Sequence, residues 1–276
     1  MESVIFNNKI VSTSELKLVQ SNRAFLYGDG VFETIKVISG HLFNYSNHFK
    51  RLTTSLDFLE INYLINKEDL HNLIVKLLKK NKISNGGSVR VSFFRESLGK
   101  YLPEQNNSSY IIQTKEQDEN IFKLNNVGLT LGLYKAQFKA ACSLSNIKSM
   151  NAILYILCSK FAQNNLLDDA IIYNNLNLPI ETSNSNIFLV NDDNILTPSL
   201  DQGCLDGTMR ALVLQILDKD FVVIKKAISE QDLYYAKEVF ITNAIYGVRF
   251  VNKIQSQNYK SSFVSHYITE ELNKLV

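Results

Sequence analysis

The residue of this chain best suited to chemistry is Lys148, in the stretch NIKSMN at residues 146–151. A lysine just before an apolar helix can hold its amine in a dry pocket, where loss of hydration favours the neutral, nucleophilic form. The alternative is a surface lysine, because the chain is rich in lysine. Lys148 is therefore a candidate nucleophile, with the surface alternative left open.

Two further features suit an anion such as a phosphate. In GCLDGTMR, Gly207 and Thr208 begin an amphipathic pattern, and the free N–H groups and dipole of a helix start bind anions. In HFKRL, Arg51 offers paired donors and a permanent charge. The alternatives are an ordinary helix start and a surface arginine. We interpret His48 as a structural hydrogen-bonding residue rather than a base.

The third feature is a polar face on a predicted strand. The strand follows RAFLYGDG, in which two glycines flank Asp29 and predict a turn with unusual backbone angles, Gly28 and Gly30. Alternation places an aromatic, a hydroxyl and an ammonium group on one face, namely Phe32, Thr34 and Lys36. The other face takes Glu33, Ile35 and Val37. The polar face is unusual for a buried sheet, and the alternative is a face exposed to solvent.

The elements that would position these residues mix strand and helix patterns. Alternating or apolar runs predict strands at residues 4–6, 9–11, 31–39, 88–94, 110–114, 128–134, 170–173, 187–190, 195–197, 222–225 and 238–242. Apolar stripes at helical spacing predict helices from Ser46, over 69–80, 150–166 and 262–274, and after Gly207. The polar stretch at 115–120 predicts a boundary between a small N-terminal α/β lobe, residues 1–116, and a larger β-rich lobe, residues 117–276. We expect an α+β fold.

The composition excludes several classes of function. The chain has 276 residues, 45% of them hydrophobic, which is enough for a sizeable core without disulfides. A net charge of +2 gives no electrostatic reason to expect nucleic acid or an anionic membrane as a partner. We recognise no signal peptide or membrane span. Cys142, Cys158 and Cys204 lack CxxC spacing, so we expect a cytoplasmic protein with no metal site.

Six motifs together resemble a known enzyme family. They are YGDGVFET, HFKRL, NIKSMN, PIETSNSNIF, LDQGCLDGTMR and EVFITNA, and the resemblance extends from about residue 22 to residue 251. In this order the motifs are similar to those of class IV aminotransferase-type enzymes, the fold-type IV pyridoxal-phosphate family. The resemblance implies a two-lobed fold, pyridoxal 5′-phosphate as the cofactor, a small-molecule amino substrate and a homodimer.

The resemblance also implies roles for single residues. Lys148 would form the Schiff base with the cofactor and later transfer protons, while Glu181 would face the pyridine nitrogen and keep it protonated. The phosphate would be held by Arg51, Gly207, Thr208 and Thr242. Thr34 would assist proton transfer as a catalytic residue. The substrate would be contacted by Phe32, Lys36, Arg95 and Asn243, with Arg95 on one carboxylate and Lys36 near a second.

The resemblance covers several reactions. The family includes branched-chain aminotransferases, D-amino-acid aminotransferases and 4-amino-4-deoxychorismate lyases. Thr34 and the stretches LDQGCLDGTMR and ITNA resemble the lyases, and Ala152 stands where branched-chain enzymes usually carry Tyr. We therefore predict a lyase that converts 4-amino-4-deoxychorismate to 4-aminobenzoate and pyruvate, a step of folate biosynthesis. The alternatives are an aminotransferase for branched-chain or D-amino acids, and a non-catalytic binding protein.

Overall fold

In the computed structural model, which describes residues 2–16, 20–192 and 194–276, the chain packs into two compact units. The first unit comprises Met1–Ile121 and Lys148–Asn151, and the second comprises Phe122–Ile147 and Ala152–Leu275. The boundary predicted after residue 116 lies a few residues before the end of the first segment. The sequence-based division does not include the segment Lys148–Asn151, where the chain returns to the first unit for four residues.

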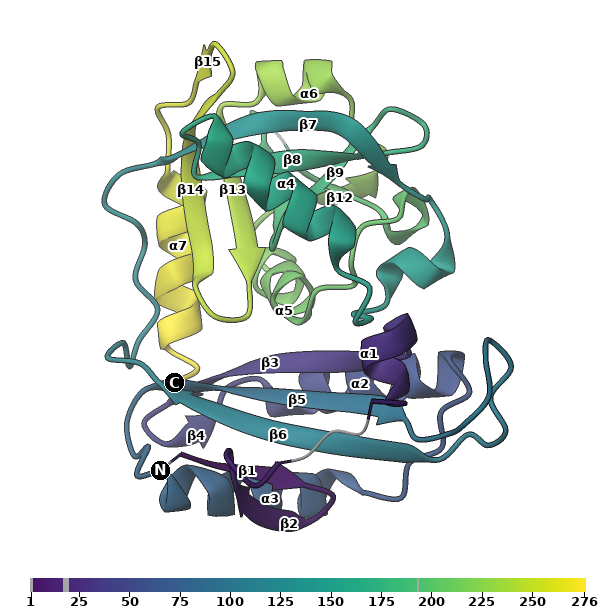
Figure 1. Ribbon diagram of the computed structural model, residues 1–276. Helices are drawn as coiled ribbons and strands as arrows, with labels where there is room; N and C mark the ends of the chain where they lie inside the picture. The colour runs from purple at the N-terminus through teal and green to yellow at the C-terminus, as the bar shows by residue number, and fades with distance from the viewer. Residues whose placement is uncertain (1, 17–19, 193) are drawn as a thin grey trace. The chain divides into compact units, whose positions relative to one another are not determined.

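The first unit is built on an antiparallel sheet with the strand order β2-β1-β6-β5-β3-β4. Its strands are β1 (Ser3–Phe6), β2 (Lys9–Ser12), β3 (Gly30–Ile38), β4 (His41–Leu42), β5 (Gly87–Arg95) and β6 (Ser108–Glu116). Its helices are α1 (Arg23–Tyr27), α2 (Tyr45–Phe58) and α3 (Lys67–Lys80) (Figure 1). The strands predicted at residues 4–6 and 9–11 are confirmed and form a hairpin, in which Asn7 and Asn8 both have the positive φ that such a tight turn requires.

The two faces of this sheet differ in character. Helices α2 and α3 bury their apolar stripes, including Leu52, Leu56, Leu70 and Ile74. They cover the face that carries Ile35, and each fully buried leucine or isoleucine contributes about 1.5–3 kcal/mol. The opposite face carries Phe32, Thr34 and Lys36, as the alternation predicts.

The second unit contains a ring of strands. Its strands are β7 (Leu129–Lys139), β8 (Asp169–Asn174), β9 (Pro179–Thr182), β10 (Asn186–Val190), β11 (Ile195–Pro198), β12 (Val223–Lys226), β13 (Glu238–Asn243), β14 (Gly247–Ile254) and β15 (Gln257–Asn258). The order is β12-β11-β10-β13-β14-β7-β8-β9, with β15 on β14. Strand β9 also pairs with β10, at Glu181 and Asn186, which closes the path from β10 round to β9.

Four helices and two short 3₁₀ turns complete this unit. They are α4 (Ile153–Asn164), α5 (Thr208–Leu217), α6 (Glu230–Tyr235), α7 (Phe263–Asn273) and the turns at Ser143–Asn146 and Leu200–Gln202. Helix α4 packs against β7 and β8, where Cys158, Ala162, Ala170 and Ile172 form a buried cluster. The carboxylate of Glu238, the first residue of β13, accepts the N–H groups of Val264 and Ser265 and so holds the start of α7. The predicted α+β class is confirmed.

Three local expectations need correction. The helix predicted from residue 150 begins at Ile153, because the residues before it run beside β3. The strand predicted to end at residue 134 continues to Lys139 across an irregularity in its pairing with β8. Of the two glycines in RAFLYGDG, Gly28 alone has a positive φ, +64°. Elements α1, α6, β9, β14 and β15 were not predicted.

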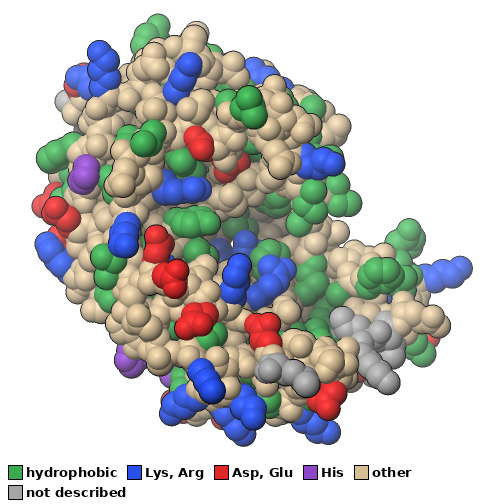
Figure 2. Space-filling view, turned by 60° about the vertical axis from the view of Figure 1, so that its left-hand side comes forward, with side chains coloured by type: hydrophobic (Ala, Val, Ile, Leu, Met, Phe, Trp, Pro, Cys, Tyr) green, Lys and Arg blue, Asp and Glu red, His purple; other side chains and the backbone are tan. Residues whose placement is uncertain are grey.

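The described residues also show whether the chain has metal-binding groups, membrane-spanning helices or paired cysteines. Among them no group of three or more His, Cys, Asp or Glu side chains could hold a metal ion. No helix within the described part of the chain has the length and apolar character needed to cross a bilayer. The three cysteines are free, with Cys142 exposed and the other two buried. Acidic and basic side chains both occur across the face shown in Figure 2, in keeping with the small net charge.

Candidate active site

Lys148 is held by backbone hydrogen bonds to strand β3. The N–H of Phe32 donates to the carbonyl of Lys148 at 3.0 Å, and the N–H of Met150 donates to the carbonyl of Gly30 at 2.9 Å. Gly30 permits this approach, because a Cβ there would overlap the Phe93 carbonyl and press on the Met150 side chain. Lys148 is half-buried and stands at a fixed point beside β3, so the surface-lysine alternative is not what the structure shows.

The polar face of β3 gathers around the ring of Phe32. The Nζ of Lys148 lies 4.5 Å from the centre of this ring, and the Cζ of Arg90 lies 3.7 Å from it. Strand pairing sets Thr34 directly opposite Arg90. Lys36 follows on the same face and is 2% exposed, so this part of the face is not exposed to solvent.

Positive charge is concentrated on this face. Arg90 is exposed and can reach a ligand, while Lys148 adds an amine and Lys36 adds another. Burial lowers the pKa of Lys36, and the nearby carboxylate of Glu119 opposes that shift. The arrangement is suited to an anionic substrate placed beside the Lys148 amine.

Arg51 is fixed by a buried carboxylate on the opposite face of β3. Its Nε donates to Oε1 of Glu33 at 2.7 Å and its Nη2 donates to Oε2 at 2.6 Å. His48 Nδ1 lies 2.6 Å from the same Oε2, which agrees with its predicted structural role. Burial by itself would raise the pKa of Glu33, but the Arg51 charge and the hydrogen bonds from His48 and Arg51 outweigh it and hold this pKa at about 2. Arg51 is therefore an oriented, largely buried cation and not a surface arginine.

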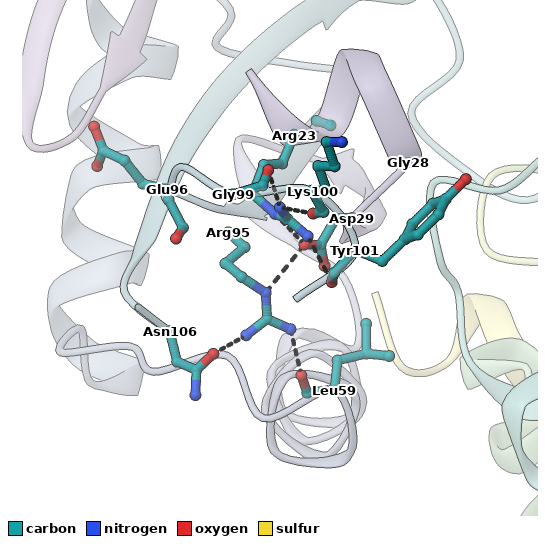
Figure 3. A network of polar contacts seen from close by, with 12 residues as sticks. Arg23, Gly28, Asp29, Leu59, Arg95, Glu96, Gly99, Lys100, Tyr101 and Asn106 are labelled. Carbon is teal, nitrogen blue, oxygen red and sulfur yellow. Dashed lines mark hydrogen bonds and ion pairs between the residues drawn. The ribbon is translucent and has the colours of Figure 1, made fainter. Parts of the chain in front are cut away.

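The guanidinium of Arg95 is bound within the protein, and its predicted contact with the substrate stays a prediction. Its guanidinium donates to Oδ2 of Asp29 at 3.0 Å, to the carbonyl of Leu59 at 2.6 Å and to the side chain of Asn106 (Figure 3). It also donates to the carbonyl of Glu60. Four of the five N–H groups of an arginine are thus used within the protein. We therefore leave Arg95 out of the proposed substrate contacts.

The same network holds the connection between β5 and β6. Arg23 shares Oδ2 of Asp29 with Arg95, and it donates to the carbonyls of Gly99 and Lys100 at 3.2 and 2.6 Å (Figure 3). The two arginines therefore tie the RAFLYGDG segment, the end of α2 and this connection together.

In the second unit, Glu181 is 2% exposed and receives three donors. Its Oε1 accepts from Nζ of Lys139 at 2.5 Å and from the hydroxyl of Tyr155 at 3.0 Å. Its Oε2 accepts from the backbone N–H of Leu205 at 2.7 Å. A carboxylate offers about four acceptor positions, so with the partners in the described part of the chain one position remains, on Oε2.

The same unit contains the predicted anion-binding residues. Gly207 precedes α5 without a side-chain cap, and Thr208 is the first residue of that helix and is buried. A Cβ at position 207 would overlap the side-chain oxygen of Asn186, so only glycine fits there. Asn186 pairs with Thr242 across β10 and β13. The Thr242 hydroxyl is buried and has no hydrogen-bond partner within the described residues.

A short loop links Glu181 to this helix start. Leu205 donates its N–H to Glu181, and its carbonyl accepts from Nδ2 of Asn186 at 2.9 Å. The buried carboxylate and the N-terminus of α5 are thereby held by one loop within the second unit.

The remaining predicted contact, Asn243, lies at the turn that follows β13. Its Oδ1 accepts the N–H groups of Ile245 and Tyr246, and its Nδ2 donates to Asn184 and Ser185 at 3.2 Å each. Its side chain therefore shapes this turn, and its substrate contact stays a prediction.

Several residues of the candidate site were missed in the sequence. Arg90 could have been found, because alternation in SVRVSFF places it with Ser88 and Ser92 on the polar face of its strand. Lys139 and Tyr155 had no such signal, since nothing local connects either residue with Glu181.

Pyridoxal 5′-phosphate, the cofactor implied by the resemblance, fits these residues. The acceptor position left on Glu181 suits a protonated ring nitrogen. The unpartnered Thr242 hydroxyl and the glycine-limited start of α5 suit a phosphate. The half-buried amine of Lys148 suits the aldehyde.

Comparison with known proteins decides the family. The family model described as amino-transferase class IV matches residues 30–254. The chain belongs to the class IV aminotransferase family. This membership confirms the predicted family and identifies the chain as a class IV enzyme.

Individual relatives of this class IV enzyme are distant. A D-alanine aminotransferase of Staphylococcus epidermidis is 26% identical over 99% of this chain and 96% of its own length. An aminodeoxychorismate lyase of Vibrio harveyi is 26% identical over 91% of this chain and 92% of its own. The structure of a branched-chain aminotransferase of Thermoproteus uzoniensis has a TM-score of 0.90 at 21% identity, covering 99% of this chain and 93% of that one, which shows the common fold.

Proposed function

We propose that this class IV enzyme uses pyridoxal 5′-phosphate to convert 4-amino-4-deoxychorismate to 4-aminobenzoate and pyruvate. The observation that carries the proposal is the cluster on the polar face of β3. There, the amine of Lys148 and the guanidinium of Arg90 both lie against the Phe32 ring, with Thr34 opposite Arg90. This cluster offers a base, a hydroxyl and a carboxylate-binding cation together.

The substrate class follows from the charges. Arg90 binds one carboxylate by paired hydrogen bonds, and Lys36 attracts a second. Thr34 and Lys36 are two positions apart on β3, a spacing of about 7 Å. The substrate of the lyase reaction carries two carboxylates, which matches the two cations.

Each residue has a defined task in the proposed reaction. Pyridoxal 5′-phosphate supplies a ring that withdraws electrons from the substrate carbon next to the amino group. Lys148 would remove the proton from this carbon, and pyruvate would leave from the neighbouring ring carbon as its enol, with the hydroxyl of Thr34 assisting proton transfer. Glu181 would face the ring nitrogen. The phosphate would be held by Arg51, Thr208 and Thr242, together with the backbone at Gly207.

An aminotransferase reaction is the second candidate, supported by the D-alanine aminotransferase relatives that align over nearly the whole chain. The same two cations would then bind a dicarboxylic amino-group donor or acceptor. The two reactions would differ in their outcome: an aminotransferase passes the amino group on to a 2-oxo acid, whereas the lyase releases a leaving group from the substrate.

One pair of assays separates the two reactions. The purified enzyme is supplied with 4-amino-4-deoxychorismate, and 4-aminobenzoate and pyruvate are measured. In parallel, D-alanine or L-leucine is supplied with 2-oxoglutarate, and glutamate is measured. We expect 4-aminobenzoate and pyruvate in equal amounts, with no oxo acid required. Glutamate formation without any aromatic product would replace the lyase with the aminotransferase.

The role of Lys148 has a matched control in the same part of the chain. Lys148→Ala is expected to abolish turnover and the visible absorption of the bound cofactor, because it removes the amine. Lys160→Ala changes an exposed lysine on α4 and is expected to preserve both. Normal turnover by the Lys148 variant would refute the mechanism.

We also propose that the enzyme is a homodimer in the cytoplasm. Exposed apolar side chains on α4 support self-association, because Ile153, Ile156 and Leu157 are 73%, 56% and 41% exposed. The free cysteines support a reducing compartment.

A further inference from the structure

The donors around Glu181 are distributed unevenly between its two oxygens. Among the described residues, Oε1 receives both the ammonium of Lys139 and the phenol of Tyr155, while Oε2 receives only the Leu205 N–H. Two donors on one oxygen leave the free acceptor position on the other. Lys139 and Tyr155 therefore determine which oxygen of Glu181 stays available.

The two donors also support each other. The Nζ of Lys139 lies 5.3 Å from the centre of the Tyr155 ring, so the ammonium is attracted both to the carboxylate and to the ring face. Burial, and then the negative charge of Glu181, raise the pKa of Tyr155 far above its ordinary value. The phenol therefore keeps its proton and remains a donor.

We propose that Lys139 and Tyr155 are positioning residues that hold the carboxylate of Glu181 with Oε2 turned toward the ring nitrogen of pyridoxal 5′-phosphate. This inference rests on the proposed function, in which Glu181 faces that nitrogen. The ion pair with Lys139 stabilises the negative charge of Glu181. A negative carboxylate beside the ring nitrogen would favour a proton on that nitrogen, where it makes the ring a stronger electron acceptor.

A purely structural role predicts a different outcome. A buried ion pair such as Lys139–Glu181 also affects folding, because loss of one partner leaves an uncompensated charge in the interior. Stability measurements alone therefore do not separate the two roles. The position of the proton on the bound cofactor does separate them, since a merely structural role leaves it unchanged.

The experiment uses the holoenzyme reconstituted with pyridoxal 5′-phosphate labelled with ¹⁵N at the ring. The ¹⁵N chemical shift of the bound cofactor reports whether this nitrogen carries a proton. The variants are Lys139→Met, Lys139→Arg and Tyr155→Phe. Tyr134→Phe is the control, because Tyr134 is another buried tyrosine whose ring packs on Phe161 of α4.

We expect a protonated ring nitrogen in the wild type and in the Lys139→Arg and Tyr134→Phe variants. Lys139→Met should shift the resonance toward the unprotonated nitrogen, because it removes the positive charge that stabilises the Glu181 carboxylate. Tyr155→Phe should cause a smaller shift in the same direction and is conservative enough to fold.

Two outcomes would overturn the inference, and they differ from failure of the proposed function. Wild-type ¹⁵N shifts in both Lys139→Met and Tyr155→Phe, with only a lower melting temperature, would assign these residues a structural role. A shift of equal size in Tyr134→Phe would show a general effect of packing. A wild-type protein that binds no pyridoxal 5′-phosphate would instead refute the proposed function, and the inference with it.

Discussion

Thr242 offers a substitution whose effects on stability and on cofactor binding have opposite signs. Its side chain is 1% exposed, and its hydroxyl has no hydrogen-bond partner within the described residues. A buried hydroxyl without a partner costs about 1–3 kcal/mol. Thr242→Val keeps the shape and removes this cost. We therefore expect the free energy of unfolding of the cofactor-free protein to rise by about 1 kcal/mol.

The same substitution removes a donor to the proposed phosphate. A hydrogen bond to a charged group contributes about 1.5–3 kcal/mol, which corresponds to about a tenfold to hundredfold change in a dissociation constant. Thr242→Val should therefore weaken the binding of pyridoxal 5′-phosphate by that factor. A group kept for a ligand is expected to show this combination of a more stable free protein and weaker binding.

The assay pairs urea unfolding of the cofactor-free protein with a titration of pyridoxal 5′-phosphate. Thr197→Val is the matched control, because Thr197 is fully buried in the same sheet and its hydroxyl donates to the Ile187 carbonyl at 2.8 Å. Thr197→Val should lower the free energy of unfolding by about 1 kcal/mol and leave cofactor affinity unchanged. If Thr242→Val lowers the free energy of unfolding as much as Thr197→Val does and leaves the affinity for pyridoxal 5′-phosphate unchanged, the phosphate role of Thr242 is refuted.

Three other predictions follow from the first unit and from α4. The pKa of Glu33 falls from 4.5 to about 2 on folding, so its stabilising contribution of about 3 kcal/mol is present above pH 4.5 and is lost as the pH falls toward 2. Glu33→Gln should therefore lower the free energy of unfolding at pH 7 and make it depend less on pH below pH 4.5. A free energy of unfolding that falls as steeply with pH as in the wild type would contradict this. Arg95→Met should lower the free energy of unfolding by about 2–4 kcal/mol and leave KM unchanged, whereas Arg90→Met should raise KM about tenfold with little loss of stability. If instead Arg95→Met raises KM and Arg90→Met does not, the substrate contact belongs to Arg95. Ile156→Asp should convert the dimer to monomers in size-exclusion chromatography with light scattering, because it places a charge on the exposed apolar face of α4; a monomeric wild type would refute the proposed dimer.

Local chemistry explains why many elements could be predicted. The Asn7-Asn8 turn, the alternation of β3 and β5 and the apolar stripes of α3 and α5 depend on neighbours within a few positions. The missed elements lack such signals: α1 is five residues long, and β9 is a four-residue strand whose every residue is buried. A strand buried on both faces shows no alternation, so its sequence pattern does not reveal it.

Arg51 and Arg95 show which feature of the site could not be predicted from the sequence. Arg51 and Arg95 are the same residue type, and both were assigned to anions. The structure gives Arg51 the carboxylate of Glu33, whereas Arg95 divides four donors between two side chains and two backbone carbonyls. Backbone carbonyls carry no side-chain signature, and the two that hold Arg95 come from Leu59 and Glu60, 36 and 35 positions away.

The amino-acid sequence by itself determined which reactive groups the chain possesses, including the Lys148 amine, the Glu181 carboxylate and the Thr242 hydroxyl, and which short segments present them. These properties depend only on the type of each residue and on the spacing of residues within a few positions. Only the tertiary structure decided that Lys148 runs beside β3, and that Lys139 reaches Glu181 from 42 positions away. The physical reason is that a buried charge needs an ionic partner, and here the partner comes from a strand far away in the sequence. The pairing of such strands is decided by the burial of the whole core.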